Sequence, residues 1–144
     1  MVVLDTIYAY GHENILCTHN TTIEITKDSF LTRKGNCILG IKASKACNDL
    51  NIKLKNLIKQ GKKLKITIKT EDFIDIFYGY GNEKLTLLSN KDVIFRKSGF
   101  ICDRTALIYC TKSAINLNRQ LINSIRFLKK KIIIIFEFND SDEY

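Results

Sequence analysis

The stretch ASKACNDLN at residues 43–51 recurs as CTKSAINLN at residues 110–118, an offset of 67 positions (110 − 43 = 67). Apolar residues follow the same offset, with Leu50, Leu54 and Ile58 matched by Leu117, Leu121 and Ile125. A supersecondary unit that occurs twice indicates a pseudo-symmetric fold, in which a site on the symmetry axis is built from both copies. The pattern predicts a single domain over residues 1–139, made of two repeats at about 1–70 and 71–139. An acidic, flexible tail is expected at 140–144.

The segments around the two copies predict several strands before each helix and one strand after it. Stretches rich in β-branched and aromatic residues, or alternating in polarity, predict strands at 2–10, 15–26, 37–43 and 63–70, and again at 73–80, 84–88, 93–96, 105–110 and 131–138. The apolar run at 132–136 is typical of a strand in the middle of a sheet, buried on both faces. The predicted fold class is α+β, a duplicated β-β-β-α-β unit. It forms a mixed sheet or partly closed barrel with two helices related by a pseudo-twofold axis. The alternative is a cradle-loop type of barrel, in which the two units interleave.

Each copy of the repeat is predicted to begin a helix. Ser44 and Thr111 precede the apolar periodicity, so their hydroxyls are expected to cap the helix starts. The apolar spacing of three and four predicts buried faces on Cys47, Leu50, Leu54, Leu57 and Ile58, and on Ala114, Leu117, Leu121, Ile125 and Leu128. Gly61 is expected to end the first helix.

Composition sets limits on location and partners. The chain has 144 residues with a formal charge of +8, and no apolar run reaches the length that spans a bilayer. Its first residues lack the basic region and cleavage site of a signal peptide, which predicts a cytoplasmic protein that does not bind membranes. The positive charge suits an anionic partner. A lysine-rich, proline-free composition is also typical of an A/T-rich genome. Codon composition alone can therefore explain the positive charge, without any role in binding.

The doubled helix start is the sharpest functional signal in the sequence. A lysine at a helix N-terminus is electrostatically unfavourable by roughly 0.3–1 kcal/mol, yet Lys45 and Lys112 repeat that arrangement. A bound anion explains it, because a capping hydroxyl, free amides and an ammonium together suit phosphate or carboxylate. Ser44, Lys45, Thr111 and Lys112 are therefore predicted to bind an anion. The alternative is a lysine that points into water.

Two basic loops extend the predicted anion site. Arg33 precedes Lys34 and Gly35, and the pair Arg96 and Lys97 lies close to Gly99. If the symmetry brings these loops and the helix starts together, Arg33, Arg96 and Lys97 complete a basic cleft on the axis. Solvated turns are the alternative. Tyrosines flank two similar turns, at 10–14 and 79–83: Tyr8, Tyr10, Tyr78 and Tyr80. Of these, Tyr10 and Tyr80 are the candidates for stacking on bases, and packing in the core or at the rim is the alternative.

Other polar residues yield weaker candidates. Asp103 and His12 are the candidates for acid–base catalysis, although Asp103 equally suits an ion pair with Arg104. His12 and His19, with neighbouring Glu13, Cys17 and Glu24, do not supply the ligands of a zinc site. The five cysteines are odd in number and lack a CxxC spacing, which indicates buried hydrophobes rather than a disulfide framework. We expect no metal site and no cofactor.

Four stretches resemble a small archaeal family known as domain of unknown function 371. They are AYGHENI (9–15), THNTTIEIT (18–26), LTRKGNCILGIKASKACNDL (31–50) and RKSGFICDRTALIYCTKSAINLNR (96–119), and they follow one another across nearly the whole chain. The resemblance implies an archaeal source, a compact domain and the same duplication, and it implies no activity. An acidic residue is expected after the glycine of the TRKGN loop, where this chain has Asn36, so no acid–base role is expected there.

The leading hypothesis is binding of a phosphate-bearing partner, RNA or a nucleotide, in a basic pseudo-symmetric cleft. One alternative is a small enzyme that acts on a phosphorylated or carboxylated metabolite with Asp103 or His12 as acid or base. A second is an assembly protein that forms a homo-oligomer through an open sheet edge. An RNA binder should lose affinity steeply with salt, an enzyme should have a pocket with a shifted acid or histidine, and an assembly protein should elute as an oligomer at any salt concentration.

Overall fold

A computed structural model describes residues 1–139, apart from the side chain of Leu128. The predicted tail at 140–144 lies outside the described residues. The described chain forms eight strands, two α-helices and two short 3-10 turns. In chain order they are β1 (Val2–Tyr10), β2 (Thr22–Thr26), β3 (Ile38–Gly40), η1 (Cys47–Asp49), α1 (Ile52–Lys59), β4 (Lys63–Lys69), β5 (Ile74–Tyr80), β6 (Asp92–Arg96), β7 (Thr105–Leu107), η2 (Ala114–Asn116), α2 (Arg119–Leu128) and β8 (Lys131–Phe138). Neither α-helix has the length and apolar character needed to cross a membrane.

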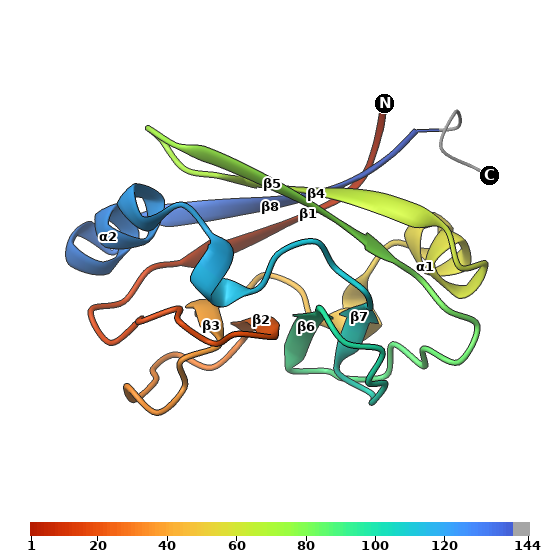
Figure 1. Cartoon of the computed structure of the whole chain (residues 1–144), viewed down its shortest axis with the longest axis horizontal. Helices are drawn as coiled ribbons and strands as arrows, with labels where there is room; N and C mark the ends of the chain where they lie inside the picture. The colour runs from red at the N-terminus through yellow and green to blue at the C-terminus, as the bar shows by residue number, and fades with distance from the viewer. Residues whose placement is uncertain (140–144) are drawn as a thin grey trace.

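The strands form two sheets rather than the one sheet or partly closed barrel expected from the sequence. The first sheet has the order β1-β8-β4-β5 and is antiparallel throughout. The second has the order β3-β2-β6-β7, with an antiparallel centre and parallel outer pairs. Figure 1 shows them as two layers, with α1 and α2 at opposite ends. The α+β class is confirmed. The strand before each helix and the strand after it lie in different sheets, because β3 and β7 belong to the second sheet and β4 and β8 to the first.

The hydrophobic core lies between the two sheets. Phe77 of β5 and Phe136 of β8 pack from the first sheet against Phe95 of β6, at ring-centroid distances of 5.2 and 5.8 Å. Alternation along β8 buries Ile132, Ile134, Phe136 and Phe138 on this side and leaves the intervening residues partly exposed. The predicted central position of β8 is confirmed, whereas its predicted burial on both faces is wrong, because no element of the described chain covers the outer face of the first sheet (Figure 1).

The predicted strand 84–88 is absent and the predicted strand 15–26 is shortened to β2, because the backbone turns away from a ladder. Residues 15–21 and 84–88 form no strand, although Ile15 and Leu85 are buried in the core. Cys17 and Leu87 have φ values of 51° and 54°, in the left-handed region that a strand cannot contain. These segments therefore insert apolar side chains without pairing. The predicted strands 37–43 and 105–110 are likewise shortened to β3 and β7.

The predicted helix caps are wrong. The hydroxyls of Ser44 and Thr111 accept hydrogen bonds from the amides of Tyr8 and Tyr78, both at 3.0 Å. Each repeat stretch first makes a 3-10 turn, and two residues, an extended leucine and an asparagine, then separate that turn from the α-helix. The side chains of Asn51 and Asn118 cap α1 and α2 instead. Asparagine at position nine of each quoted stretch is the signal that the sequence reading missed.

The predicted buried helix faces agree with the structure. Leu54 and Ile58 of α1 and Leu121 and Ile125 of α2 are buried, as are the preceding turn residues, and Leu57 is half-buried. The side chain of Leu128 lies outside the described part of the chain. Gly61 follows α1 with φ +76°, as predicted for a residue that ends a helix.

Two glycines set how closely the first sheet approaches the helices. A Cβ on Gly11 would lie 1.9 Å from the carbonyl oxygen of Ile125 in α2, and a Cβ on Gly81 would lie 1.9 Å from that of Ile58 in α1. Backbone cannot move aside as a flexible side chain can. These positions therefore require glycine so that each strand end can rest against the last turn of a helix.

We expect Gly11→Ala and Gly81→Ala each to lower the free energy of unfolding by about 3 kcal/mol, because the added methyl overlaps a helix carbonyl. Gly61→Ala is the matched control. Its Cβ meets nothing closer than 3.9 Å, so only the left-handed backbone penalty of about 1 kcal/mol applies. Urea unfolding of the three variants measures the difference, and equal losses would contradict this account.

Candidate functional site

The two lysines of the predicted anion site are held by buried carboxylates. Lys45 Nζ lies 2.7 Å from the Asp5 carboxylate, whose side chain is 7% exposed. Lys112 pairs in the same way with Asp75, which is 6% exposed. Each carboxylate also accepts the backbone amide that precedes an α-helix, from Asn51 or Asn118, at 2.7 Å. Both lysines thus already have an anionic partner within the protein.

The remaining predicted residues lie apart from these lysines and from one another. Lys45 and Lys112 approach β1 and β5, which are the two edges of the first sheet. Arg96 belongs to the second sheet. Arg33 and Lys97 are exposed in separate loops. No contact within residues 1–139 gathers these groups into one cleft.

The two candidate acid–base residues occupy ordinary polar environments. Asp103 is exposed and accepts a hydrogen bond from the Thr86 hydroxyl at 2.9 Å. His12 is half-buried, and its Nδ1 accepts the Asn14 amide at 2.9 Å. The structure does not place the two side chains in contact.

The outer face of the first sheet carries a regular array of basic and aromatic side chains. We call this surface the platform. Strand register places alternate residues of all four strands on it, opposite the core. Its lysines and tyrosines are Tyr8 and Tyr10 of β1, Lys131 of β8, Lys63, Lys65 and Lys69 of β4, and Tyr78 and Tyr80 of β5. On these strands Glu137 is the acidic residue of the platform, and its carboxylate accepts the Thr67 hydroxyl at 2.7 Å.

Lysine and tyrosine meet at two opposite corners of the platform. Lys131 Nζ lies 4.2 Å from the ring centre of Tyr8, and Lys63 Nζ lies 4.9 Å from that of Tyr78. Both distances suit a cation–π contact. With strand and residue spacings of a regular sheet, the corners lie about 20 Å apart. The platform has four lysines, Lys63, Lys65, Lys69 and Lys131. None of them makes an ion pair within the described residues, so their charges are available to a ligand.

The platform is accessible and slightly hollowed. Tyr8, Tyr10 and Tyr80 are 40%, 39% and 41% exposed. A shallow cavity of about 310 Å³ lies where β4 ends beside the start of β8, and Lys69, Lys131 and Ile133 of the platform contribute to its lining. This is the arrangement in which a chain of bases and phosphates can lie flat against a sheet.

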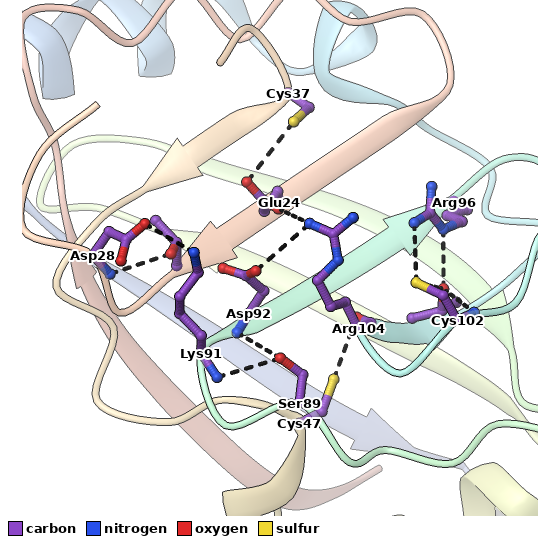
Figure 2. A network of polar contacts seen from close by, with 12 residues as sticks. Glu24, Asp28, Cys37, Cys47, Ser89, Lys91, Asp92, Arg96, Cys102 and Arg104 are labelled. Atoms are coloured by element: carbon purple, nitrogen blue, oxygen red, sulfur yellow. Dashed lines mark hydrogen bonds and ion pairs between the residues drawn. The ribbon is translucent and has the colours of Figure 1, made fainter. Parts of the chain in front are cut away.

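The second sheet bears a buried polar network on its face away from the core (Figure 2). Glu24 of β2 and Asp92 of β6 are almost fully buried, and one guanidinium, that of Arg104, reaches both carboxylates at 3.4 and 3.7 Å. Burial raises the pKa of Glu24 above its usual value, the charge of Asp92 raises it further, and Arg104 opposes both effects. Glu24 was not a candidate acid–base residue on sequence grounds, because its burial beside Asp92 requires the pairing of β2 with β6.

Arg96 stabilises a thiolate at the other end of this network (Figure 2). Its Nη2 lies 3.5 Å from Cys102 Sγ, and its Nε donates to the Thr105 hydroxyl at 3.0 Å. Burial by itself raises the pKa of Cys102, but the Thr105 hydroxyl, the Arg104 backbone and Arg96 outweigh it and lower that pKa to about 7.

Of the other four cysteines, Cys17, Cys47 and Cys110 are buried and Cys37 is half-buried. Burial raises the pKa of Cys37 to about 11 and those of Cys17, Cys47 and Cys110 to about 12. All five are free thiols. Within residues 1–139, no group of three or more histidine, cysteine, aspartate and glutamate side chains is arranged to hold a metal ion.

Comparison with known proteins places the chain in a family. The family described as Domain of unknown function (DUF371) matches residues 7–139. The chain belongs to this family. An archaeal relative, the uncharacterized protein MJ0206 of Methanocaldococcus jannaschii, is 39% identical over 129 residues, which cover 90% of this chain and 96% of the relative.

Family membership confirms the resemblance predicted from the sequence, and the relative supports the archaeal assignment. Neither description names a reaction or a ligand. The arrangement of side chains in this chain is therefore what indicates a function. Two regions stand out by their side chains. One is the platform, with its lysines and tyrosines, and the other is the buried Glu24–Arg104–Asp92 network.

We expect Cys102 to be alkylated by iodoacetamide at neutral pH, with a rate that rises through a midpoint near pH 7. Cys37 is the matched control, since it is also half-buried but has a pKa of about 11. Peptide mapping by mass spectrometry should show Cys102 reacting about 100-fold faster or more at pH 7, because the thiolate is the reactive form. Removal of the positive charge in Arg96→Gln should shift the midpoint upward, and an unchanged midpoint would contradict the assigned cause.

Ionised Glu24 is expected to lower stability. A carboxyl whose pKa is higher in the folded state contributes stability below its unfolded pKa and loses that contribution as pH rises through the folded value. The free energy of unfolding of the wild type should therefore fall, relative to Glu24→Gln, as the pH rises from about 4 to neutrality. Urea unfolding across this range measures the difference, and parallel profiles for the two proteins would argue against a raised pKa.

Proposed function

We propose that this protein binds single-stranded RNA on the platform, the outer face of the β1-β8-β4-β5 sheet. The observation that carries the proposal is the pairing of lysine with tyrosine at two opposite corners, Lys131 with Tyr8 and Lys63 with Tyr78, on a face that no described element covers.

Two physical terms support this ligand. Unpaired bases stack on exposed tyrosine rings, a contact worth about 1–3 kcal/mol per base. Lysines beside those rings neutralise the phosphates and release their counterions. A single strand suits the platform better than a duplex, because a duplex hides the faces of its bases.

The anion-binding residues predicted from the sequence have a smaller part in this proposal. Arg33 and Lys97 are exposed and can attract the strand through charge alone. Lys45, Lys112 and Arg96 are already engaged, with Asp5, Asp75 and Cys102 respectively. The hydroxyls of Ser44 and Thr111 accept backbone amides, so their lone pairs serve the fold.

Internal duplication belongs to the same proposal, because it explains why the platform has two alike corners. Contacts recur at fixed offsets: Asp5 with Lys45 is matched by Asp75 with Lys112 (75 − 5 = 70 and 112 − 45 = 67). The backbone contacts of Ser44 and Thr111 and the tight glycines 11 and 81 recur in the same way. A pseudo-twofold axis through the middle of the platform would relate the two halves.

The test is fluorescence anisotropy of a labelled single-stranded RNA from low to physiological salt. We expect Lys63→Ala/Lys131→Ala to weaken binding and to reduce the slope of log affinity against log salt by about 1.4, which corresponds to two lost phosphate contacts. Tyr8→Ala/Tyr78→Ala should weaken binding about tenfold or more at every salt concentration through lost stacking.

Two controls separate the platform from general basicity. Lys53→Ala/Lys84→Ala removes two exposed lysines elsewhere and should leave affinity nearly unchanged. Tyr8→Phe/Tyr78→Phe keeps the rings and should bind as the wild type does. Equal affinity of the wild type and all variants, or no binding by the wild type, would refute the proposal.

A further inference from the structure

A cavity opens beside one corner of the platform, and we call it the corner pocket. Its volume is about 350 Å³. It lies where the two sheets join, because Tyr10 at the end of β1 and Ile41 after β3 exchange two backbone hydrogen bonds of 2.9 Å. The lining residues come from four separate segments: Tyr10, Gly11, His12, Ser29, Ile41, Lys42 and Lys129.

The corner pocket is positively charged and lacks a carboxylate among its lining residues. Lys42 and Lys129 are exposed, and neither ammonium has an ion pair or a hydrogen bond within residues 1–139. Lys129 terminates α2 and is in the left-handed region, with φ 49°. Lys42 has φ 53°, and its amide donates to the carbonyl of Asp28 at 2.8 Å. Two lysines without an ion pair within the described residues thus line one small cavity.

Two further lining residues, His12 and Ser29, can donate hydrogen bonds beside the lysines. Nδ1 of His12 accepts the Asn14 amide, so the proton of the neutral ring is on Nε2. The hydroxyl of Ser29 has no hydrogen-bond partner within the described residues. A cavity whose lining residues carry two ammonium groups, an imidazole and a hydroxyl suits a compact anion with several acceptor oxygens.

The opposite corner supplies an internal comparison. Its cavity of about 520 Å³ is lined by the counterparts Tyr80, Gly81, Asn82 and Ile108, with Tyr109 in place of Lys42 (109 − 42 = 67) and Gly61 in place of Lys129 (129 − 61 = 68). Tyr109 and Gly61 are also left-handed, with φ 50° and 76°. The unusual backbone is therefore common to both corners. Lys42 and Lys129 distinguish the corner pocket, whereas the opposite cavity has one lysine, Lys59, among its lining residues. A carboxylate, Glu83, lines the opposite cavity.

We propose that the corner pocket binds the terminal phosphate of an RNA strand lying on the platform. This inference rests on the proposed function. A terminal phosphomonoester carries a charge of about −1.5 to −2 at neutral pH, whereas each internal phosphodiester carries one negative charge, so two free lysines favour the strand end. Tyr10 connects the two surfaces, because it lines the pocket and is the cross-strand neighbour of Lys131 on the platform. A strand anchored here extends over Tyr8 toward the opposite corner, and its polarity is then fixed.

The experiment compares one RNA sequence with a 5′-phosphate, a 3′-phosphate or hydroxyl groups at both ends, each labelled internally. We expect one phosphorylated form to bind about tenfold tighter or more than the hydroxyl form, from two charge-assisted hydrogen bonds. The preferred end reports the polarity of the strand. Adenosine monophosphate, a free phosphomonoester, should compete away this advantage without displacing the hydroxyl form from the platform.

The test variants are Lys42→Asn and Lys129→Gly, because asparagine and glycine suit left-handed backbone and remove the charge without a folding penalty. The double variant should bind all three RNAs equally, at the affinity of the hydroxyl form. Lys59→Gln, in the opposite cavity, is the matched control and should keep the preference. Circular dichroism and thermal unfolding check that each variant is folded.

The outcomes distinguish the two proposals. If all three RNAs bind the wild type equally and platform variants still weaken binding, the terminal-phosphate inference is wrong and the proposed function stands. If no RNA binds, both are wrong. A preference that persists in the folded double variant, or disappears in Lys59→Gln, would also overturn the assignment to the corner pocket.

Discussion

The structure depends on two buried carboxylates, Asp5 and Asp75. Each accepts a hydrogen bond from a lysine and another from the amide that begins a helical segment, and each lies within an edge strand of the first sheet. A carboxylate that is only 6–7% exposed requires such partners, since a buried charge without them costs several kcal/mol. The requirement fixes the path of the chain between each edge strand and the helix that follows the repeat stretch. Lys45 and Lys112, which the sequence suggested as anion-binding residues, therefore form ion pairs with Asp5 and Asp75 instead.

Helix placement then determines which surfaces remain open. Because each helix is tied to an edge strand and rests against Gly11 or Gly81, α1 and α2 lie at the ends of the molecule rather than over the sheet (Figure 1). The core is completed between the sheets by Phe77, Phe95 and Phe136. The outer face of the first sheet is left without a covering layer. A face in this position is free to carry lysine and tyrosine, and the platform is the result.

The two polar regions differ in how far the sequence reveals them. Alternation in KLKITIK at 63–69 shows directly that lysines share one face of β4. The contact between Lys131 and Tyr8 depends on how β1 pairs with β8, and these two strands are far apart in the chain. The low pKa of Cys102 requires Arg96 and Thr105 to converge on one sulfur. Local sequence patterns cannot report such convergence, because electrostatic effects depend on distance in space.

The sequence by itself determined the family, the α+β class, the central position of β8, the buried face of each helix and the end of the first helix at Gly61. The family follows from the resemblance of four stretches, and the other properties follow from local periodicity and backbone preference, which act over a few residues. Tertiary structure alone decided that the strands divide into two sheets, that the helices begin at Ile52 and Arg119, and that Lys45 and Lys112 are ion-paired. It also decided which lysines stay free, at the platform and in the corner pocket. The physical reason is that these contacts join residues 40 (Lys45 with Asp5) to 136 (Phe138 with Val2, 138 − 2 = 136) positions apart, where sequence spacing carries no information about distance.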